Sequence, residues 1–266
     1  RENFIEPLEE TMRKAFPRFA TVNSRRLLAF WMEMLQVPRE RMTAGEVRML
    51  QMFQFTIWQK SYEECGFTSL LDGIMEVRKN STLCAELLEL LQYNFGRIDF
   101  IDERVEVGFD CPLDLHCDYT RDQILVALDF LKPSTVREGV KYLPDQKIDI
   151  AFVTLNKSDK DYSPSTMYQD YSVGEEFFHW QSQSTTSENS PTGQRYIHHR
   201  EKGTLFLLFV RENKTDRVSG GAGVYTFLGK ANYVQHEGSR PMSILWKLER
   251  PIPVRLQKKT NELVGG

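Results

Sequence analysis

Apolar residues recur every three or four positions through the first 95 residues, which is the spacing of one face of an α-helix. The runs 27–35 and 47–58 follow this spacing closely. Thr43 opens a capping-box motif, Ser81 precedes a further apolar repeat, and Gly96 is a typical helix stop. The pattern predicts five helices packed as a bundle, which forms a first domain over residues 1–103.

Strand-length apolar runs replace the helical pattern in the second part of the chain. A capping-box sequence at Thr120 predicts one inserted helix, which Pro133 ends. Segment 182–192 is polar and rich in turn-forming residues, which predicts a mobile loop. The expected fold class is α+β, in which an all-α bundle is followed, over residues 104–266, by a curved, mostly antiparallel sheet or open barrel. The expected strands are 148–155, 177–183, 204–211, 224–228 and 242–248.

A loop with unusual composition separates the expected strands 148–155 and 177–183. It contains Tyr162, Tyr168 and Tyr171, although glycine, serine and proline would suffice for a surface connection. Structureless loops of roughly 20 residues are uncommon unless they are functional. Because these rings could stack on a planar ligand, the loop is a candidate binding site. The alternative is that the rings cap the barrel or sandwich.

Composition places the chain among soluble globular proteins. It has 266 residues, of which 41% are hydrophobic and 12% aromatic, and it has no apolar run long enough to span a membrane. No signal peptide is recognisable, so a cytoplasmic location is expected. The four cysteines show no C-x-x-C pairing, which favours reduced thiols and disfavours zinc. The chain starts with Arg1 instead of Met, which suggests a piece of a longer protein.

Charge is distributed unevenly along the chain. Residues 106–192 hold 7 Lys/Arg against 15 Asp/Glu, whereas residues 193–266 hold 13 against 6. A basic block on one side of the fold could neutralise nucleic-acid phosphates even though the net charge of the chain is -3. The alternative is that these charges are scattered over solvated strand faces.

A search for catalytic motifs finds one weak candidate. The chain lacks the phosphate-binding loop, the H-E-x-x-H zinc motif and the G-x-S-x-G nucleophile motif. Glu212 and Lys214 have the Glu-x-Lys form of a metal-dependent nuclease strand, with Asp149 as a conceivable partner. The histidines have no carboxylate or cysteine at metal-site spacing, so hydrogen-bonding or surface roles are expected for them. These are His116, His179, His198, His199 and His236.

Two long segments, 137–196 and 225–256, carry a family resemblance, and the sequence PLDLHCDYTRDQILVAL at 112–128 fits as its beginning. They resemble the C-terminal region of SauUSI-like ATP-dependent type IV (modification-dependent) restriction enzymes, which combine a phospholipase-D-type nuclease with a superfamily II helicase. The resemblance implies an SRA-like reader that flips 5-methylcytosine out of double-stranded DNA, with 5-hydroxymethylcytosine as an alternative target. The helical half would be the coupler between motor and reader. It implies no membrane partner and no cofactor for this piece, whereas the parent protein, with its helicase and nuclease domains, would use ATP and a divalent metal.

A second similarity concerns the flipping loop of SRA domains, in which a Tyr, an Asp, a Gly, a Phe and an aromatic strand start follow one another. The order Tyr168, Asp170, Gly174, Phe177 and Trp180 is similar. By this correspondence Tyr168 and Trp180 are the stacking walls, and Asp170 accepts a hydrogen bond from the exocyclic amine of the base. Gln181 and Ser182 are the donors to the rest of the base edge. Met167, Phe177 and Phe178 are candidates for a recess that receives the methyl group.

The expected base pocket comprises Tyr168, Asp170, Tyr171, Phe178, His179, Trp180, Gln181 and Ser182. The expected contacts to the DNA backbone are Arg195, Arg200, Lys202, Arg217, Lys230 and Arg240. A DNA-reading module with no active site of its own is therefore the preferred function. The alternatives are a metal-dependent nuclease that uses Asp149, Glu212 and Lys214, and a protein-docking module whose aromatic loop grips a partner chain.

Overall fold

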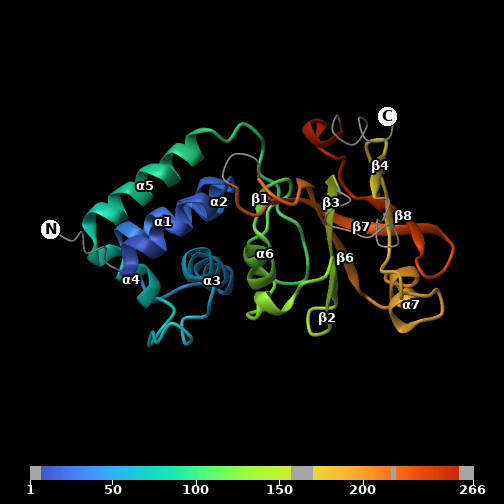
Figure 1. Cartoon of the computed structure of the whole chain (residues 1–266), viewed down its shortest axis with the longest axis horizontal. Helices are drawn as coiled ribbons and strands as arrows, with labels where there is room; N and C mark the ends of the chain where they lie inside the picture. Colours follow the sequence, from blue (N-terminus) through green and yellow to red (C-terminus); the bar gives the residue numbers. More distant parts are fainter. Residues whose placement is uncertain (1–6, 157–169, 217–219, 258–266) are drawn as a thin grey trace. The chain divides into compact units, whose positions relative to one another are not determined.

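The chain is a mixed α/β protein that forms two compact units, one ending at Arg137 and the other starting at Glu138 (Figure 1). The computed structural model describes residues 7–156, 170–216 and 220–257. The change of sequence pattern near residue 103 lies inside the first unit, because the helix at 121–127 packs on the helix at 44–58. None of the described helices is long and apolar enough to cross a membrane.

The first unit, here called the helical unit, is built from helices whose apolar faces pack on one another. Phe19, Trp31 and Phe53 meet at its centre, with ring centroids 5.5 to 5.7 Å apart. The capping boxes expected at Thr43 and Thr120 are confirmed, whereas the last long helix is capped by Asn80 and begins at Ser81. The elements are α1 (Pro7–Ala20), α2 (Arg25–Gln36), α3 (Ala44–Trp58), α4 (Asp72–Lys79), α5 (Ser81–Gly96), β1 (Asp118–Tyr119), α6 (Arg121–Ala127) and the 3-10 helix η1 (Pro133–Thr135).

A buried ion pair ties the irregular segment before β1 to the start of α2. The carboxylate of Asp114 accepts hydrogen bonds from Arg26, at 2.8 and 3.3 Å, and from the hydroxyl of Ser24 at 3.1 Å. Burial raises the pKa of Asp114, and the guanidinium of Arg26 opposes this shift. Ser24 is also the N-cap of α2, so one cluster fixes both the helix start and the segment that packs on it.

The second unit, here called the sheet unit, contains an open sheet in the order β2-β3-β6-β7-β8-β5-β4. β3 and β6 are parallel, and the other neighbouring pairs in this order are antiparallel. The five expected strands are confirmed, although β7 continues well beyond its expected end. The strands are β2 (Val140–Leu143), β3 (Ile148–Asn156), β4 (Tyr171–Val173), β5 (Phe177–Gln181), β6 (Leu205–Asn213), β7 (Tyr225–Glu237) and β8 (Ser243–Leu248).

One helix of the sheet unit, α7 (Pro191–Ile197), starts within the segment expected to be a mobile loop. Ser190 caps it by accepting a hydrogen bond from the N–H of Gly193 at 3.0 Å, and Pro191 occupies its first position. With only 7 residues, the helix is too short to show apolar periodicity in the sequence. The expectation of a mobile loop is therefore corrected, because the end of that segment is helical and the rest is hydrogen bonded.

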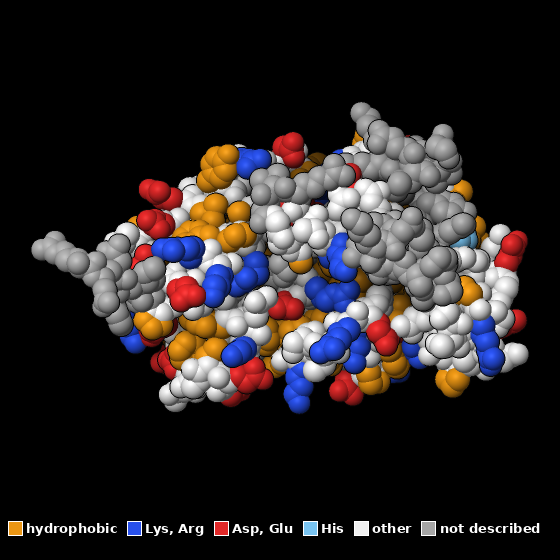
Figure 2. All heavy atoms as spheres, viewed as in Figure 1, with side chains coloured by type: hydrophobic (Ala, Val, Ile, Leu, Met, Phe, Trp, Pro, Cys, Tyr) orange, Lys and Arg blue, Asp and Glu red, His pale blue; other side chains and the backbone are white. Residues whose placement is uncertain are grey.

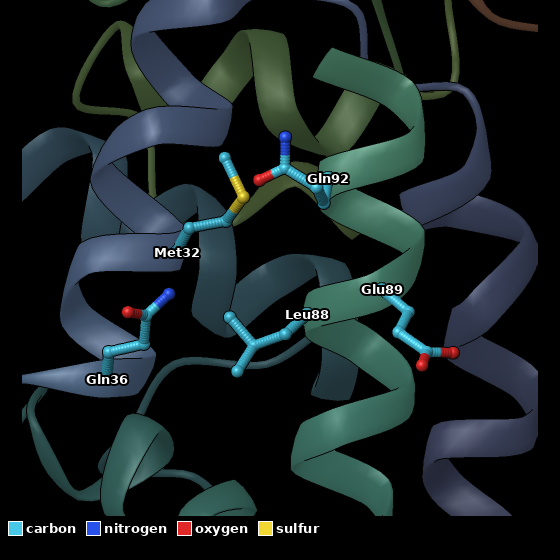
Figure 3. Close-up of a pocket in the computed structure, with 5 residues that line it drawn as sticks. All are labelled: Met32, Gln36, Leu88, Glu89 and Gln92. Atoms are coloured by element: carbon cyan, nitrogen blue, oxygen red, sulfur yellow. The ribbon is translucent and has the colours of Figure 1, made fainter. Parts of the chain in front are cut away.

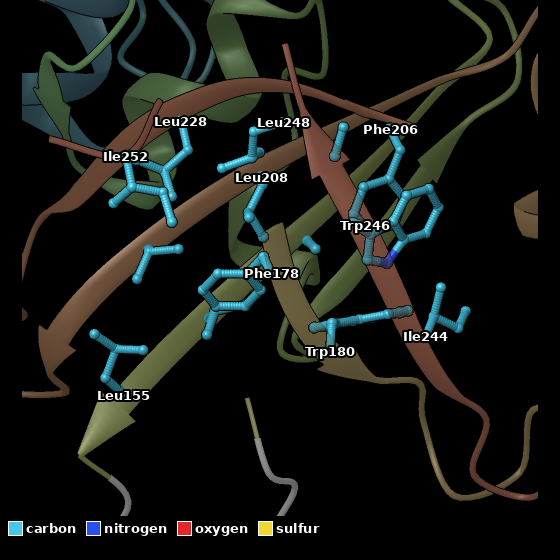
Figure 4. Close-up of a cluster of buried hydrophobic side chains, with 14 of the residues drawn as sticks. Leu155, Phe178, Trp180, Phe206, Leu208, Leu228, Ile244, Trp246, Leu248 and Ile252 are labelled. Carbon is cyan, nitrogen blue, oxygen red and sulfur yellow. The ribbon is translucent and has the colours of Figure 1, made fainter. Parts of the chain in front are cut away.

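The sheet has a large apolar face that α7 helps to cover. It carries Phe178, Trp180, Phe206, Ile244 and Trp246, whose side chains point toward one another in Figure 4. We call it the inner face. The opposite side of β5, β8 and the adjoining part of β7 is the outer face. Strand residues alternate between the two faces, so this division decides which side chains can meet a ligand.

Candidate nucleic-acid interface

Strand alternation separates the residues that the sequence groups in one base pocket. Phe178 and Trp180 are 1% and 3% exposed and lie on the inner face (Figure 4). His179 and Gln181 alternate with them along β5, so they lie on the outer face, where they are half-buried. A flipped base cannot contact both sets at once, because the sheet itself lies between them. The proposed pocket therefore splits, and the period of two along β5 is the physical reason.

Trp180 is a core residue and not an open stacking wall. Its ring makes edge contacts with Tyr196 and Phe206, at centroid distances of 5.4 and 5.3 Å. Phe206 in turn stacks on Trp246 at 3.8 Å, with 13° between the ring planes. With its neighbours so close and almost no exposed surface, the indole leaves no space for a base to stack. The local sequence could not reveal this, since an aromatic core and an aromatic pocket have the same composition.

Ser182 is also committed to the fold. Its N–H donates to the carbonyl of Met242 at 2.9 Å, and its hydroxyl accepts from the N–H of Met242 at 2.9 Å. The fully buried side chain thus extends the β5–β8 ladder and is not a donor to a ligand. Asp170 lies immediately before β4, where its carboxylate accepts a hydrogen bond from the N–H of Gln181 at 2.9 Å. Tyr168, and the side chain of Tyr171, lie outside the described residues.

The outer face presents polar and aromatic side chains in three cross-strand rows. Directly paired residues share a face, so the strand register defines each row. Gln181 donates to the hydroxyl of Ser243 at 3.3 Å, and Lys247 lies 5.8 Å from the ring centroid of Phe177. All of these residues are half-buried or exposed. The rows are Phe177, Lys247 and Asn232; His179, Leu245 and Gln235; and Gln181, Ser243 and Glu237.

The expected basic surface is divided in the same way as the pocket. Arg195 forms a two-pronged ion pair with Asp149, at 2.7 and 2.8 Å, and its guanidinium lies 3.7 Å from the ring centroid of Tyr142. Burial raises the pKa of Asp149, although Arg195 opposes that shift, and Asp149 raises the pKa of Arg195 against its own desolvation. Arg195 is therefore a structural residue that joins α7 to β3 and not a phosphate contact.

The other expected backbone contacts lie in different places. Arg200 donates to the side chain of Asn232 at 3.4 Å, and Lys230 lies 3.5 Å from Glu249. Lys202 and Arg240 are exposed, and Arg217 lies outside the described residues. On the face shown in Figure 2, Lys and Arg side chains are interspersed with Asp and Glu side chains. The basic side chains in view thus do not form one uninterrupted patch on that face.

A protein-family model described as Domain of unknown function (DUF3427) matches residues 113–259, which is more than half of the chain. The chain belongs to the DUF3427 family. No curated protein matches it. The DUF3427 match begins beside Asp114 in the helical unit and includes every strand of the sheet, and hence the whole outer face. The family description assigns no activity, so the site itself must carry any functional argument.

The metal-dependent nuclease alternative fails on distance within the DUF3427 sheet. Asp149 pairs with Phe206, and Asn156 pairs with Asn213, so Asp149 and Glu212 are six positions apart along the strands. At a rise of about 3.3 Å per residue, this separates them by roughly 20 Å. Asp149 is also occupied by Arg195. In the described part of the chain, no group of three or more His, Cys, Asp or Glu side chains could hold a metal ion.

His199 has a hydrogen-bonding role in the DUF3427 domain. Its Nε2 accepts from the N–H of Tyr233 at 3.0 Å, and its Nδ1 lies 3.1 Å from the carbonyl of Thr204, to which it donates. One ring nitrogen must therefore be a donor and the other an acceptor, which requires neutral imidazole. Burial lowers the pKa of His199 in agreement with this tautomer, while the bond to Thr204 opposes the shift.

The helical unit has a pocket of about 340 Å³ between α2 and α5 (Figure 3). It is lined by Met32, Gln36, Leu88, Glu89 and Gln92. These side chains supply one carboxylate and two amides around an apolar floor, without a nucleophile or a positive charge. We therefore place the candidate site on the outer face of the DUF3427 sheet and not in this pocket.

Proposed function

We propose that this chain is a DNA-reading module that recognises 5-methylcytosine in double-stranded DNA, with 5-hydroxymethylcytosine as the alternative target. The observation that carries the proposal is the outer face, where His179 and Gln181 stand side by side with the amides and hydroxyl of β7 and β8. Asp170 adjoins them through its bond to the backbone of Gln181. Rings and amide groups are what proteins use to stack on a base and to read its edge.

In this proposal the reader is SRA-like in chemistry, but it uses different walls from those expected. His179 and Phe177 offer planes for stacking, and Gln181 can both donate and accept along a base edge. Taking a base out of the helix costs a few kcal/mol, while stacking on a ring returns about 1 to 3 kcal/mol. Two outer-face rings are therefore sufficient in energy to hold a flipped base.

Selectivity for the methyl group needs a close apolar contact. Burying one methyl group contributes about 0.8 kcal/mol, or about a fourfold preference at 25 °C. Phe177 and Leu245 are the apolar side chains of the outer-face rows, and Leu245 is paired directly with His179. We propose that they form the recess. The reader would serve an ATP-dependent, modification-dependent restriction enzyme in the cytoplasm, and the ATP and divalent metal would belong to its helicase and nuclease domains.

Binding of the full chain to matched duplexes tests the proposal. The two duplexes differ only in cytosine or 5-methylcytosine at one position, and binding is measured by fluorescence anisotropy. The wild type should prefer the methylated duplex, and Gln181→Ala or His179→Ala should reduce that preference to about one. Gln92→Ala removes an exposed amide from the helical unit and is the matched control, which should behave as wild type. Equal affinity of the wild type for both duplexes would overturn the proposal.

A further inference from the structure

Two loops at the end of the outer face are locked together by hydrogen bonds. The segments 182–190 and 238–242, here called the paired loops, follow β5 and precede β8, respectively. The N–H of Arg240 donates to the carbonyl of Thr186 at 3.1 Å, and the N–H of Glu188 donates to the hydroxyl of Ser239 at 3.1 Å. Together with the two bonds between Ser182 and Met242, these contacts continue the β5–β8 ladder into the loops.

A side chain of β7 and the helix α7 both contact the first of the paired loops. His236 on β7 lies with Nε2 3.6 Å from a carboxylate oxygen of Glu188, and its Nδ1 is 2.6 Å from the hydroxyl of Tyr233. Gly193 on α7 approaches the first loop so closely that a Cβ there would lie 2.1 Å from the carbonyl oxygen of Ser187. Thr186, on the first loop, is itself buried. The base of the paired loops is therefore packed and hydrogen bonded, unlike a flexible surface connection.

Arg240 is an exposed residue of the second of the paired loops. Its backbone has a φ of 63°, a left-handed conformation that non-glycine residues rarely adopt and that costs of order 1 kcal/mol. Its guanidinium has no ion pair or hydrogen bond with any residue that the structure describes. Among the other described arginines of the sheet unit, Arg195, Arg200 and Arg211 donate hydrogen bonds from their side chains, and Arg250 and Arg255 each have an interaction of their own.

We propose that Arg240 reads a guanine next to the modified cytosine, through the O6 and N7 atoms in the major groove. A planar guanidinium matches these two acceptors with two parallel hydrogen bonds, which is the commonest specific contact between proteins and base edges. The inference rests on the proposed function, since the row of Gln181, Ser243 and Glu237 at the loop base belongs to the same outer face. The bonds of the paired loops fix the backbone position from which Arg240 projects, which favours a two-pronged contact of defined geometry over a simple phosphate contact.

The test uses the full chain and a panel of duplexes in which each base pair around the modified cytosine is changed in turn. The wild type should show one flanking position at which replacing guanine lowers affinity about 5- to 150-fold. Arg240→Lys keeps the charge but replaces the planar fork by a single ammonium group, so it should weaken the preference for the flanking guanine and leave the salt dependence unchanged. Lys132→Ala, in the helical unit, is the control for loss of one exposed charge, and it should keep the flanking preference.

Arg240→Gly provides a variant that does not strain the loop, because glycine adopts a positive φ freely. It should fold with a wild-type melting temperature and lose the flanking preference. A flanking preference that survives in Arg240→Lys and Arg240→Gly would overturn the inference, as would an equal loss of affinity for every duplex in Arg240→Gly, which marks a phosphate contact. If the wild type reads the flanking guanine but ignores the methyl group, the proposed function fails while the role of Arg240 stands.

Discussion

The ion pair between Arg195 and Asp149 is a buried polar contact that contributes to the stability of the sheet unit. Removing one member of a buried ion pair leaves the other charge without a partner, which typically costs about 3 to 5 kcal/mol. We expect Arg195→Ala to lower the free energy of unfolding by that amount. Urea unfolding monitored by tryptophan fluorescence measures it, because Trp180 and Trp246 lie in the adjoining core.

A double substitution separates the two contributions to this effect. Arg195→Met with Asp149→Asn removes both charges and keeps similar volumes, so it should be markedly less destabilising than Arg195→Ala. A double variant as unstable as the single one would mean that the packing of Arg195 on Tyr142, and not the stranded carboxylate, dominates.

His199 gives the stability of the sheet unit a dependence on pH. Burial lowers its pKa in the folded state below the unfolded value of about 6.5. The stabilisation by neutral His199 is therefore complete above about pH 6.5 and is lost as the pH falls through the lower pKa of the folded state. Urea midpoints from pH 8 to pH 5 should fall for the wild type, and the part due to this residue should be absent in His199→Asn. Parallel pH profiles would contradict the assignment.

At the scale of elements, short sequence patterns correctly predicted the helix caps and strands that depend on neighbouring residues. Both capping boxes and the central strands follow from short sequence patterns, because each depends on residues only a few positions apart. The parallel pairing of β3 with β6 and the helix α7 were missed. The parallel pairing depends on residues that are distant in sequence. The helix α7 has only 7 residues, so its stability comes from packing and not from its own sequence.

At the candidate site, too, the sequence pattern could not predict what depends on contacts distant in sequence. The sequence located β5 and hence His179 and Gln181, but it did not show that Trp180 faces the other way. An alternating strand carries two faces, and burial of one of them is decided by strands that follow much later in the chain. Segment 182–192, which contains the first of the paired loops, was predicted to be a mobile polar loop, because its hydrogen-bond partners lie about 50 residues away in sequence.

Gly193 provides a prediction for an element contact. A Cβ at this position would lie 2.1 Å from the carbonyl of Ser187 and 2.9 Å from that of Glu188. Gly193→Ala should therefore push the loop from α7 and lower stability by about 1 to 3 kcal/mol. Gly96→Ala is the matched control, since its Cβ would meet nothing within 4 Å, and it should be neutral or slightly stabilising. Thermal unfolding of both variants decides the matter, and equal effects would be inconsistent with the close approach.

At the scale of the whole molecule, the helical unit extends past the expected boundary at residue 103. Asp114 bonds to Arg26, Asp129 bonds to Arg48, and Gln123 bonds to Thr56. Three residues that follow position 103 are therefore bonded to the earlier helices α2 and α3. A fragment of residues 1–137 should unfold cooperatively by circular dichroism, whereas a fragment of residues 1–103 should show a broader transition at lower temperature. Identical melting curves for the two fragments would instead support a domain boundary near residue 103.

The strand order also dictates when the sheet can form during synthesis. β5 pairs with β4 and β8, and β8 ends at Leu248, so a ribosome must make nearly the whole sheet unit before β5 acquires its second neighbour. Until then the inner side of β5, with Phe178 and Trp180, lacks the strand that carries Trp246. Contacts so distant in sequence form slowly, and exposed apolar strands aggregate. Nascent chains of this protein should therefore need shielding until the last strand emerges.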